Sequence, residues 1–214
     1  MPDLKKFHVF PCETLPEVKI IEYNIFGDNR GYFYESFNER EFNEAIGQDL
    51  HFVQDNKSCS RVFTIRGLHY QVPPHAQDKL VGVARGSIID FAVDIRKGSP
   101  TYGKYVAVRL SEDLHRMLFI PKGFAHGFIA FQDNTILTYK CSDYYDKESE
   151  RSINIFDDDL NIKEVRSIDT SWIMMSEKDL DAIKFKEIES DFIYEGKERP
   201  NSIDQSLLST QESR

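Results

Sequence analysis

The stretch Ile89-Asp90-Phe91-Ala92-Val93-Asp94-Ile95 decides the fold, because large apolar side chains alternate in it with acidic or small ones. Successive side chains of a β-strand point to opposite faces of its sheet. The residues at 89, 91, 93 and 95 therefore share one face, and those at 90, 92 and 94 share the other. Val106, Val108 and Leu110 repeat this alternation one turn later. The pattern predicts neighbouring strands, each with an apolar face.

Short strands are predicted on both sides of this stretch. A first candidate strand runs from Val18 to Tyr23, and strand signals then follow closely from His51 to Tyr145. Turn-forming residues separate them at Arg85–Ser87, Lys97–Pro100, Pro121–Gly123 and Asp133-Asn134. Many short strands at this spacing favour a sandwich or a jelly-roll barrel.

Only short helices are predicted. The first begins at Ser36, with Glu39 at capping-box spacing, and ends at Gly47; its apolar face comprises Phe42, Ala45 and Ile46. The second begins in Ser176-Glu177-Lys178-Asp179 and is followed by Leu180, Ile183 and Phe185. The expected fold is mainly β, with a few short helices.

The composition is that of a soluble protein with one main domain. The chain has 214 residues, 40% of them hydrophobic, which is enough to bury a core. We expect one domain over residues 1–186. Residues 187–214 are polar and charged, and we interpret them as a tail with marginal packing that is open to disorder.

The charge and the cysteines exclude several classes of function. A formal net charge of -9 argues against a nucleic-acid surface, although a few local cations can still hold a diphosphate. Cys12, Cys59 and Cys141 have neither the number nor the spacing of a disulfide framework or a zinc site. Residues 1–10 lack the apolar run of a signal peptide, and no apolar run is long enough to span a membrane. We therefore expect a cytoplasmic protein.

Three segments place basic residues in strand-like stretches: Arg66–Gln71, Lys79–Val81 and Phe124–Phe128. A strand can direct alternate side chains into a β-barrel, and histidine suits proton transfer near neutral pH. A single strand histidine is more often a core residue, but His69 is accompanied by Arg66, Lys79 and His126. Arg66 and His69 lie on opposite strand faces unless a bulge intervenes, and Gly67 is a natural place for one. These segments predict acid–base chemistry in the mouth of a barrel.

A metal site is the competing interpretation, because jelly-roll proteins of the cupin type often hold a metal with histidines and a glutamate. That site needs a His-x-His pair followed by a carboxylate. Here Gln71 stands two residues after His69, and His75 lies beyond Pro73-Pro74. Lys79 would also repel a cation. We therefore favour a site without a metal.

Tyrosines and an aspartate extend the candidate site. Tyr139 lies in a predicted strand and is either an ordinary half-buried tyrosine or a proton donor whose pKa a nearby cation lowers. Tyr144 and Tyr145 follow it, and an aromatic ring beside a cleft can stack on a nucleobase. Asp179 is accounted for equally by the capping box that Ser176 opens.

Together, these segments closely resemble the dTDP-4-dehydrorhamnose 3,5-epimerase family. The resemblance runs in order from about Ile20 to Asp179, which makes it highly specific. The matching motifs are Phe26–Phe33, Phe52–Asn56, Arg66–Gln71, Lys79–Val81, Val93–Arg96, Ser99–Gly103, Ile120–Phe128, Tyr139-Lys140 and Ser176–Asp179. The resemblance implies a cupin-type jelly roll (a double-stranded β-helix) that works as a homodimer, without metal or cofactor.

Roles follow from the resemblance, position by position. The general base falls on His69, its orienting aspartate on Asp179, the lysine near the sugar on Lys79 and the proton-donating tyrosine on Tyr139. The tyrosine that stacks on the base falls on Tyr145. The other substrate-binding positions fall on Arg30, Glu35, Gln54, Asp55, Asn56, Arg66, His126, Glu150 and Lys178. The chain departs from the family in the loop Val72–His75 and after Asp157.

The resemblance implies an isomerase that converts dTDP-4-dehydro-6-deoxy-D-glucose to dTDP-4-dehydro-L-rhamnose, for dTDP-rhamnose and polysaccharide (lipopolysaccharide) biosynthesis. One alternative is a C3-only or 3,5-epimerase of another 4-keto sugar nucleotide, such as a GDP-linked 6-deoxy-heptose. More remote alternatives are a metal-dependent cupin and a non-catalytic sugar-nucleotide binding module. The complete set of His69, Lys79, Tyr139 and Asp179 speaks against the last, because binding alone needs no base and acid together.

Overall fold

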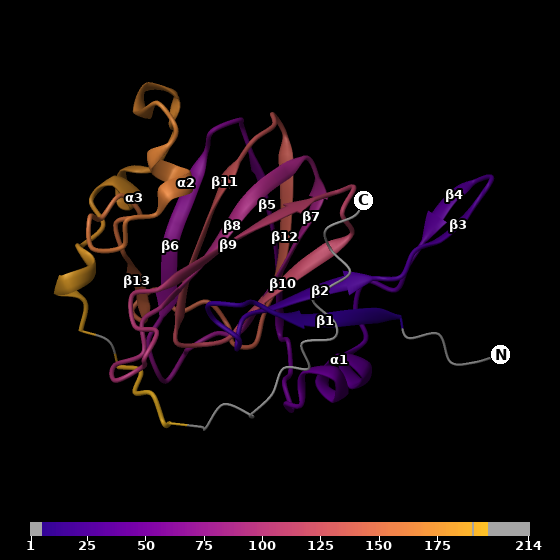
Figure 1. The fold of residues 1–214 in the computed structure, drawn as a ribbon, viewed down its shortest axis with the longest axis horizontal. Helices are drawn as coiled ribbons and strands as arrows, with labels where there is room; N and C mark the ends of the chain where they lie inside the picture. The colour runs from indigo at the N-terminus through magenta and orange to yellow at the C-terminus, as the bar shows by residue number, and fades with distance from the viewer. Residues whose placement is uncertain (1–5, 190, 197–214) are drawn as a thin grey trace.

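The computed structural model describes residues 6–189 and 191–196, which form two antiparallel sheets packed face to face (Figure 1). The six-stranded sheet contains, in spatial order, β1 (Phe7–Pro11), β2 (Lys19–Tyr23), β10 (Arg116–Ile120), β7 (Lys79–Arg85), β12 (Thr135–Cys141) and β5 (Gln54–Ser60). The five-stranded sheet contains β13 (Glu150–Ser152), β6 (Ile65–Gln71), β11 (Phe124–Ala130), β8 (Ser87–Asp94) and β9 (Tyr105–Ser111). From β5 to β13 the chain passes repeatedly from one sheet to the other. This arrangement confirms the predicted jelly roll.

The inner core lies between the two sheets. Val81 and Leu137 of the six-stranded sheet pack in one cluster with Ile88, Ala92 and Phe128 of the five-stranded sheet. These residues lie on the inward faces of their strands, since alternate residues of β8 point outward. The same inward faces carry the polar residues of the candidate site.

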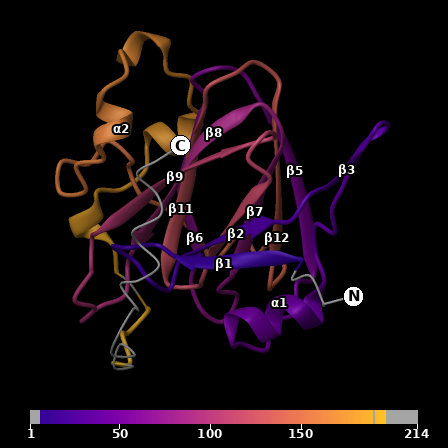
Figure 2. The same ribbon diagram turned by 45° about the vertical axis from the view of Figure 1, so that its right-hand side comes forward.

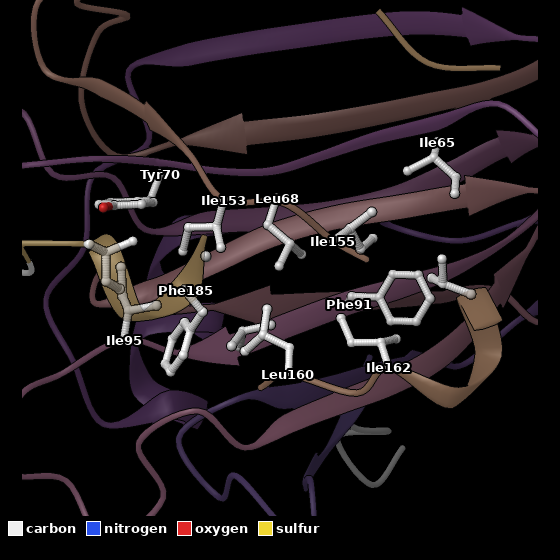
Figure 3. Close-up of a cluster of buried hydrophobic side chains, with 14 of the residues drawn as sticks. Ile65, Leu68, Tyr70, Phe91, Ile95, Ile153, Ile155, Leu160, Ile162 and Phe185 are labelled. Carbon is white, nitrogen blue, oxygen red and sulfur yellow. The ribbon is translucent and has the colours of Figure 1, made fainter. Parts of the chain in front are cut away.

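A second cluster covers the outer face of the five-stranded sheet. Phe91, Val93 and Ile95 share one face, as predicted; this face points outward, and the chain after β13 folds over it (Figure 3). That chain contributes Ile153, Ile155, Leu160, Ile162, Val165, Phe185 and Ile188. It contains α2 (Lys163–Arg166), η1 (Thr170–Trp172), the predicted α3 (Glu177–Leu180) and η2 (Phe185–Glu187).

The predicted tail begins within this covering layer. Ile188 is buried against the sheet, so packing continues past residue 187. Residues 197–214 lie outside the described residues, and the predicted domain boundary stays a prediction.

Helix α1 (Glu39–Ile46) packs against the outer face of the six-stranded sheet through Phe42 and Ile46 (Figure 1). The predicted start at Ser36 is wrong. Asn38 caps the helix instead, because its side-chain oxygen accepts the backbone N–H of Glu41. Gly47 ends the helix in the left-handed conformation, with φ 70°, as predicted. Ala45, expected on the apolar face, is exposed.

The N-terminal region forms an arm. A turn at Asn29 and Arg30 connects β3 (Phe26–Asp28) to β4 (Gly31–Phe33), and this hairpin projects from the body in both ribbon views (Figures 1 and 2). Tyr32 and Phe33 on it are 60% and 68% exposed. Tyr32 contacts the rings of Tyr34 and His115, but both Tyr32 and Phe33 keep most of their surface exposed. Within the described part of the chain, no helix is long and apolar enough to cross a bilayer.

Candidate active site

His69 and Asp179 form a buried pair. His69 lies on β6, and its Nε2 is 2.5 Å from Oδ1 of Asp179, which is only 3% exposed. Ser176 caps α3 by accepting the backbone N–H of Asp179, and its hydroxyl donates to Oδ2 of the same carboxylate at 2.9 Å. Asp179 therefore makes both contacts at once: it belongs to the helix cap, and its carboxylate is hydrogen-bonded to His69.

Asp179 is held ionised. Burial works to raise the pKa of this carboxyl, but the hydrogen bonds with His69 and Ser176 prevail and lower it. A carboxylate on one nitrogen of an imidazole fixes the tautomer and leaves the other nitrogen to accept a proton. His69 thus has the surroundings that a general base requires.

A bulge in β6 aligns Arg66 with His69. His126 of β11 pairs with His69 of β6, and Phe128 of β11 pairs with Arg66 of β6. The two pairs are thus two residues apart on β11 but three residues apart on β6. Paired residues share a face, so the extra residue in β6 places Arg66 and His69 on the same face, as Gly67 suggested. A Cβ at Gly67 would lie 2.5 Å from the carbonyl oxygen of His126, and this close approach requires glycine.

A second pair lies beside the first. His126 faces His69 across the two strands, and its Nε2 is 2.7 Å from Oδ1 of Asp90. The pair is buried, with Asp90 fully inaccessible. Asp90 is not among the predicted site residues. The sequence nevertheless contained a sign of it: the alternation in Ile89–Ile95 places an acidic residue, Asp90, on the same strand face as the small apolar Ala92.

Lys79 and Tyr139 approach from the other sheet. Lys79 opens β7 and pairs with Cys141 of β12, while Tyr139 pairs with Val81, so these side chains share the inward face. Burial lowers the pKa of Lys79, against the opposing influence of Cys141, Asp90 and Glu150. The surroundings of Lys79 therefore oppose its charge, while the Asp90 and Glu150 carboxylates favour it.

The pKa of Tyr139 differs from the expectation. The prediction that a cation lowers it is wrong in net direction: burial is the largest influence and raises it, and the lowering influence of Arg66 does not prevail. A raised pKa keeps the phenol protonated at neutral pH. That is the form a proton donor needs.

Glu150 connects the predicted nucleotide-binding residues. Its Oε2 accepts the hydroxyl of Tyr145 at 2.9 Å and forms an ion pair with Lys178 at 2.5 Å. The backbone N–H of Tyr145 donates to Gln54, whose amide in turn donates to Asn56. Tyr145 is 55% exposed, which leaves its ring accessible for stacking.

Three predicted binding residues do not join this cluster. The Asp55 side chain lies on the opposite strand face from Gln54 and Asn56 and pairs with Lys140. Arg30 pairs with Asp28 on the arm, and Glu35 pairs with Lys6 at its base. Arg66 is in an intermediate position. Its guanidinium donates to the hydroxyl of Ser60 and to the carbonyl of Cys59, but the residue lies on the same strand face as His69.

Two further features lie apart from this arrangement. A recess of about 230 Å³ lies on the outer face of the six-stranded sheet, lined by residues such as Tyr34, Gly82 and His115, and it contains none of the predicted site residues. Among the described residues, no group of three histidine, cysteine or acidic side chains is arranged to hold a metal ion.

Comparisons with known proteins point to one family. A sequence profile described as dTDP-4-dehydrorhamnose 3,5-epimerase matches residues 13–187. The enzyme of that name from Shigella flexneri is 46% identical over 175 residues, which cover 80% of this chain and 92% of the relative. The counterpart from Methanothermobacter thermautotrophicus is 47% identical over 161 residues, covering 75% of this chain and 85% of the relative.

Solved structures extend the comparison. The dTDP-6-deoxy-D-glucose-3,5-epimerase of Legionella pneumophila, in complex with dTDP-4-keto-L-rhamnose, has a TM-score of 0.81 and 42% identity, covering 89% of this chain and all of that chain. A 3'-monoepimerase from Streptomyces bikiniensis in complex with dTDP-quinovose has a TM-score of 0.76 and 30% identity, over 82% of this chain and 87% of that chain. The fold is therefore the cupin-type jelly roll of these epimerases, and the chain belongs to the dTDP-4-dehydrorhamnose 3,5-epimerase family.

Proposed function

We propose that the protein epimerises C3 and C5 of a nucleotide-linked 4-keto-6-deoxy sugar, converting dTDP-4-dehydro-6-deoxy-D-glucose to dTDP-4-dehydro-L-rhamnose. The observation that carries the proposal is the carboxylate-oriented His69, which faces the same interior as Lys79 and Tyr139. Relatives of that name at 46% identity, and the solved relative bound to dTDP-4-keto-L-rhamnose, support the substrate. A nucleotide-sugar substrate also supports a cytoplasmic location.

The chemistry starts from the acidity of a carbon next to a ketone. Loss of a proton from C3 or C5 leaves an enolate whose negative charge lies on the C4 oxygen. His69 removes the proton and becomes an imidazolium, which Asp179 stabilises. Lys79 stabilises the oxyanion, and a positioned charge in a dry site contributes several kcal/mol. Tyr139 returns a proton to the opposite face of the same carbon, which inverts it.

Binding falls to the surrounding residues. Tyr145 stacks on the nucleobase, and Lys178, Arg66, Gln54 and Asn56 surround the diphosphate and the sugar. Glu150 holds Tyr145 and Lys178 in place in the free protein.

Incubation in D2O tests the proposed function directly. The protein is mixed with dTDP-4-keto-6-deoxyglucose, and deuterium incorporation is followed by NMR or mass spectrometry. We expect solvent deuterium at both C3 and C5, because each inversion replaces a carbon-bound hydrogen with one from solvent. The same incubation without protein measures spontaneous exchange. Absence of uptake above that background would contradict the proposal for this sugar.

A C3-only epimerase is the second candidate, and the similarity to the 3'-monoepimerase at 30% identity is the observation that favours it. Deuterium at C3 alone would assign the chain to this reaction. The same assay therefore decides between the two activities.

We also propose that the protein is a homodimer in which the arm reaches the partner's site. The exposed aromatic hairpin, which projects from the body (Figure 1), supports this, as does Arg30, which lies in the turn between β3 and β4 and pairs with Asp28. We expect light scattering at micromolar concentration to give twice the mass of the chain. A fully active monomer would refute the proposal.

A further inference from the structure

Asp90 is a buried acid that the reaction as derived so far does not use. It is fully inaccessible and lies on the inward face of β8, between the core residues Ile88 and Ala92. One carboxylate oxygen binds His126, and the other is buried without a hydrogen-bond partner in the described part of the chain. Burying an acceptor without a partner is costly, so the free oxygen calls for an explanation.

Lys79 provides one. It enters the same interior from the opposite sheet, and no hydrogen bond or ion pair joins its ammonium group to another residue among 6–189 and 191–196. Charge attraction between the two groups acts in both directions: Lys79 works to lower the pKa of Asp90, and Asp90 works to raise that of Lys79. Burial is the larger influence on each, so the net pKa shifts are upward for Asp90 and downward for Lys79.

We propose that Asp90 is a positioning residue of the epimerase: its carboxylate holds the His126 ring opposite His69 and keeps Lys79 as an ammonium ion. A buried cation without a nearby anion loses its proton to avoid the cost of desolvation. An oxyanion at C4 is stabilised by an ammonium group and not by a neutral amine. The inference thus rests on the proposed function and adds the group that maintains the charge of Lys79.

Other groups that face Lys79 are less suited to this task. Glu150, on β13, already accepts hydrogen bonds from Tyr145 and Lys178. Cys141, on β12, is buried, and burial is the largest influence on its thiol and raises the pKa, which keeps it neutral. Tyr139 is likewise protonated, and His126 is turned toward Asp90. The carboxylate with a free oxygen is that of Asp90.

Asp90→Asn tests the proposal, because it keeps the shape and an acceptor for His126 but removes the charge. Lys79 must be protonated to act, so activity falls as the pH rises through its pKa. Removing Asp90 lowers that pKa, and the alkaline limb of kcat/KM moves to lower pH. We expect kcat/KM to fall at least about tenfold more at about pH 9 than at about pH 6.5.

Asp94→Asn is the matched control. Asp94 is also fully buried on the inward face of β8, but it is bound by Arg96, Ser99 and Thr101 in a structural cluster. Its replacement should reduce thermal stability and leave the pH profile in place. Asp90→Glu keeps the charge, so it should retain the wild-type alkaline limb of kcat/KM even if altered packing lowers the overall rate. If Asp90→Asn does not fold, Asp90→Glu is the variant to be measured.

A double-variant comparison identifies the group that responds. In a Lys79→Gln background, Asp90→Asn should no longer move the alkaline limb of the residual exchange. A shift that persists there would assign the effect to Tyr139 and overturn the proposal, as would an unshifted limb in folded Asp90→Asn. If the wild-type protein itself shows no epimerisation, the proposed function fails instead.

Discussion

Replacing His69 with asparagine is expected to abolish solvent exchange at both C3 and C5 while leaving dTDP affinity nearly intact. A general base contributes about 10²–10⁴-fold, and loss of the base that serves both carbons should reach or exceed the upper value. Asparagine occupies a similar volume and can still contact Asp179, so the residues around the His69–Asp179 pair keep their packing. Deuterium incorporation and dTDP titration by calorimetry measure the two effects separately.

His51→Asn is the control for this substitution. His51 also pairs with a carboxylate, Glu39, but on the exposed surface at α1. The His51→Asn variant should leave solvent exchange at C3 and C5 unchanged. If His69→Asn kept more than about a tenth of wild-type exchange, His69 would lose its role as the base.

Tyr139→Phe is expected to separate exchange from epimerisation. His69 can still remove the proton, and its imidazolium can return solvent deuterium to the same face with retained configuration. The far face receives no proton, so net epimerisation falls by orders of magnitude, on the scale of about 10²–10⁴-fold. Simultaneous measurement of deuterium content and product configuration checks this expectation.

Tyr105→Phe removes a comparable strand hydroxyl, which donates to Glu164 on the outer face of the other sheet. It should affect stability and neither reaction. Equal losses of exchange and epimerisation in Tyr139→Phe would contradict the division of roles between His69 and Tyr139. An undiminished product yield would show that Tyr139 is structural.

The parts of the fold that the sequence could predict are those set by local periodicity. Alternation in Ile89–Ile95 predicted which residues share a face, and the outer cluster, which contains Phe91, Val93 and Ile95, confirms it; that this face points outward did not follow from the alternation. Gly67 predicted the bulge because only a residue without Cβ tolerates the approach of β11. The capping pattern at Ser176 predicted α3 at the place where it begins.

The parts that escaped prediction depend on contacts between distant segments. Asp90 meets His126 only because β8 and β11 are neighbours, which no local pattern reveals. The outward direction of Asp55 depends on where β5 enters the sheet. Asn38 competes with Ser36 as a cap, and the packing of Phe42 onto the sheet selects between them.

The layer that covers the five-stranded sheet also determines when the catalytic pair can exist. His69 belongs to a strand near the middle of the chain, whereas Asp179 arrives on α3 from the segment that folds over the outer face (Figures 1 and 3). A nascent chain that has completed both sheets still lacks the carboxylate that orients its base. During synthesis, Asp179 therefore emerges after every strand of both sheets, and His69 has no carboxylate partner from α3 until the covering segment has docked.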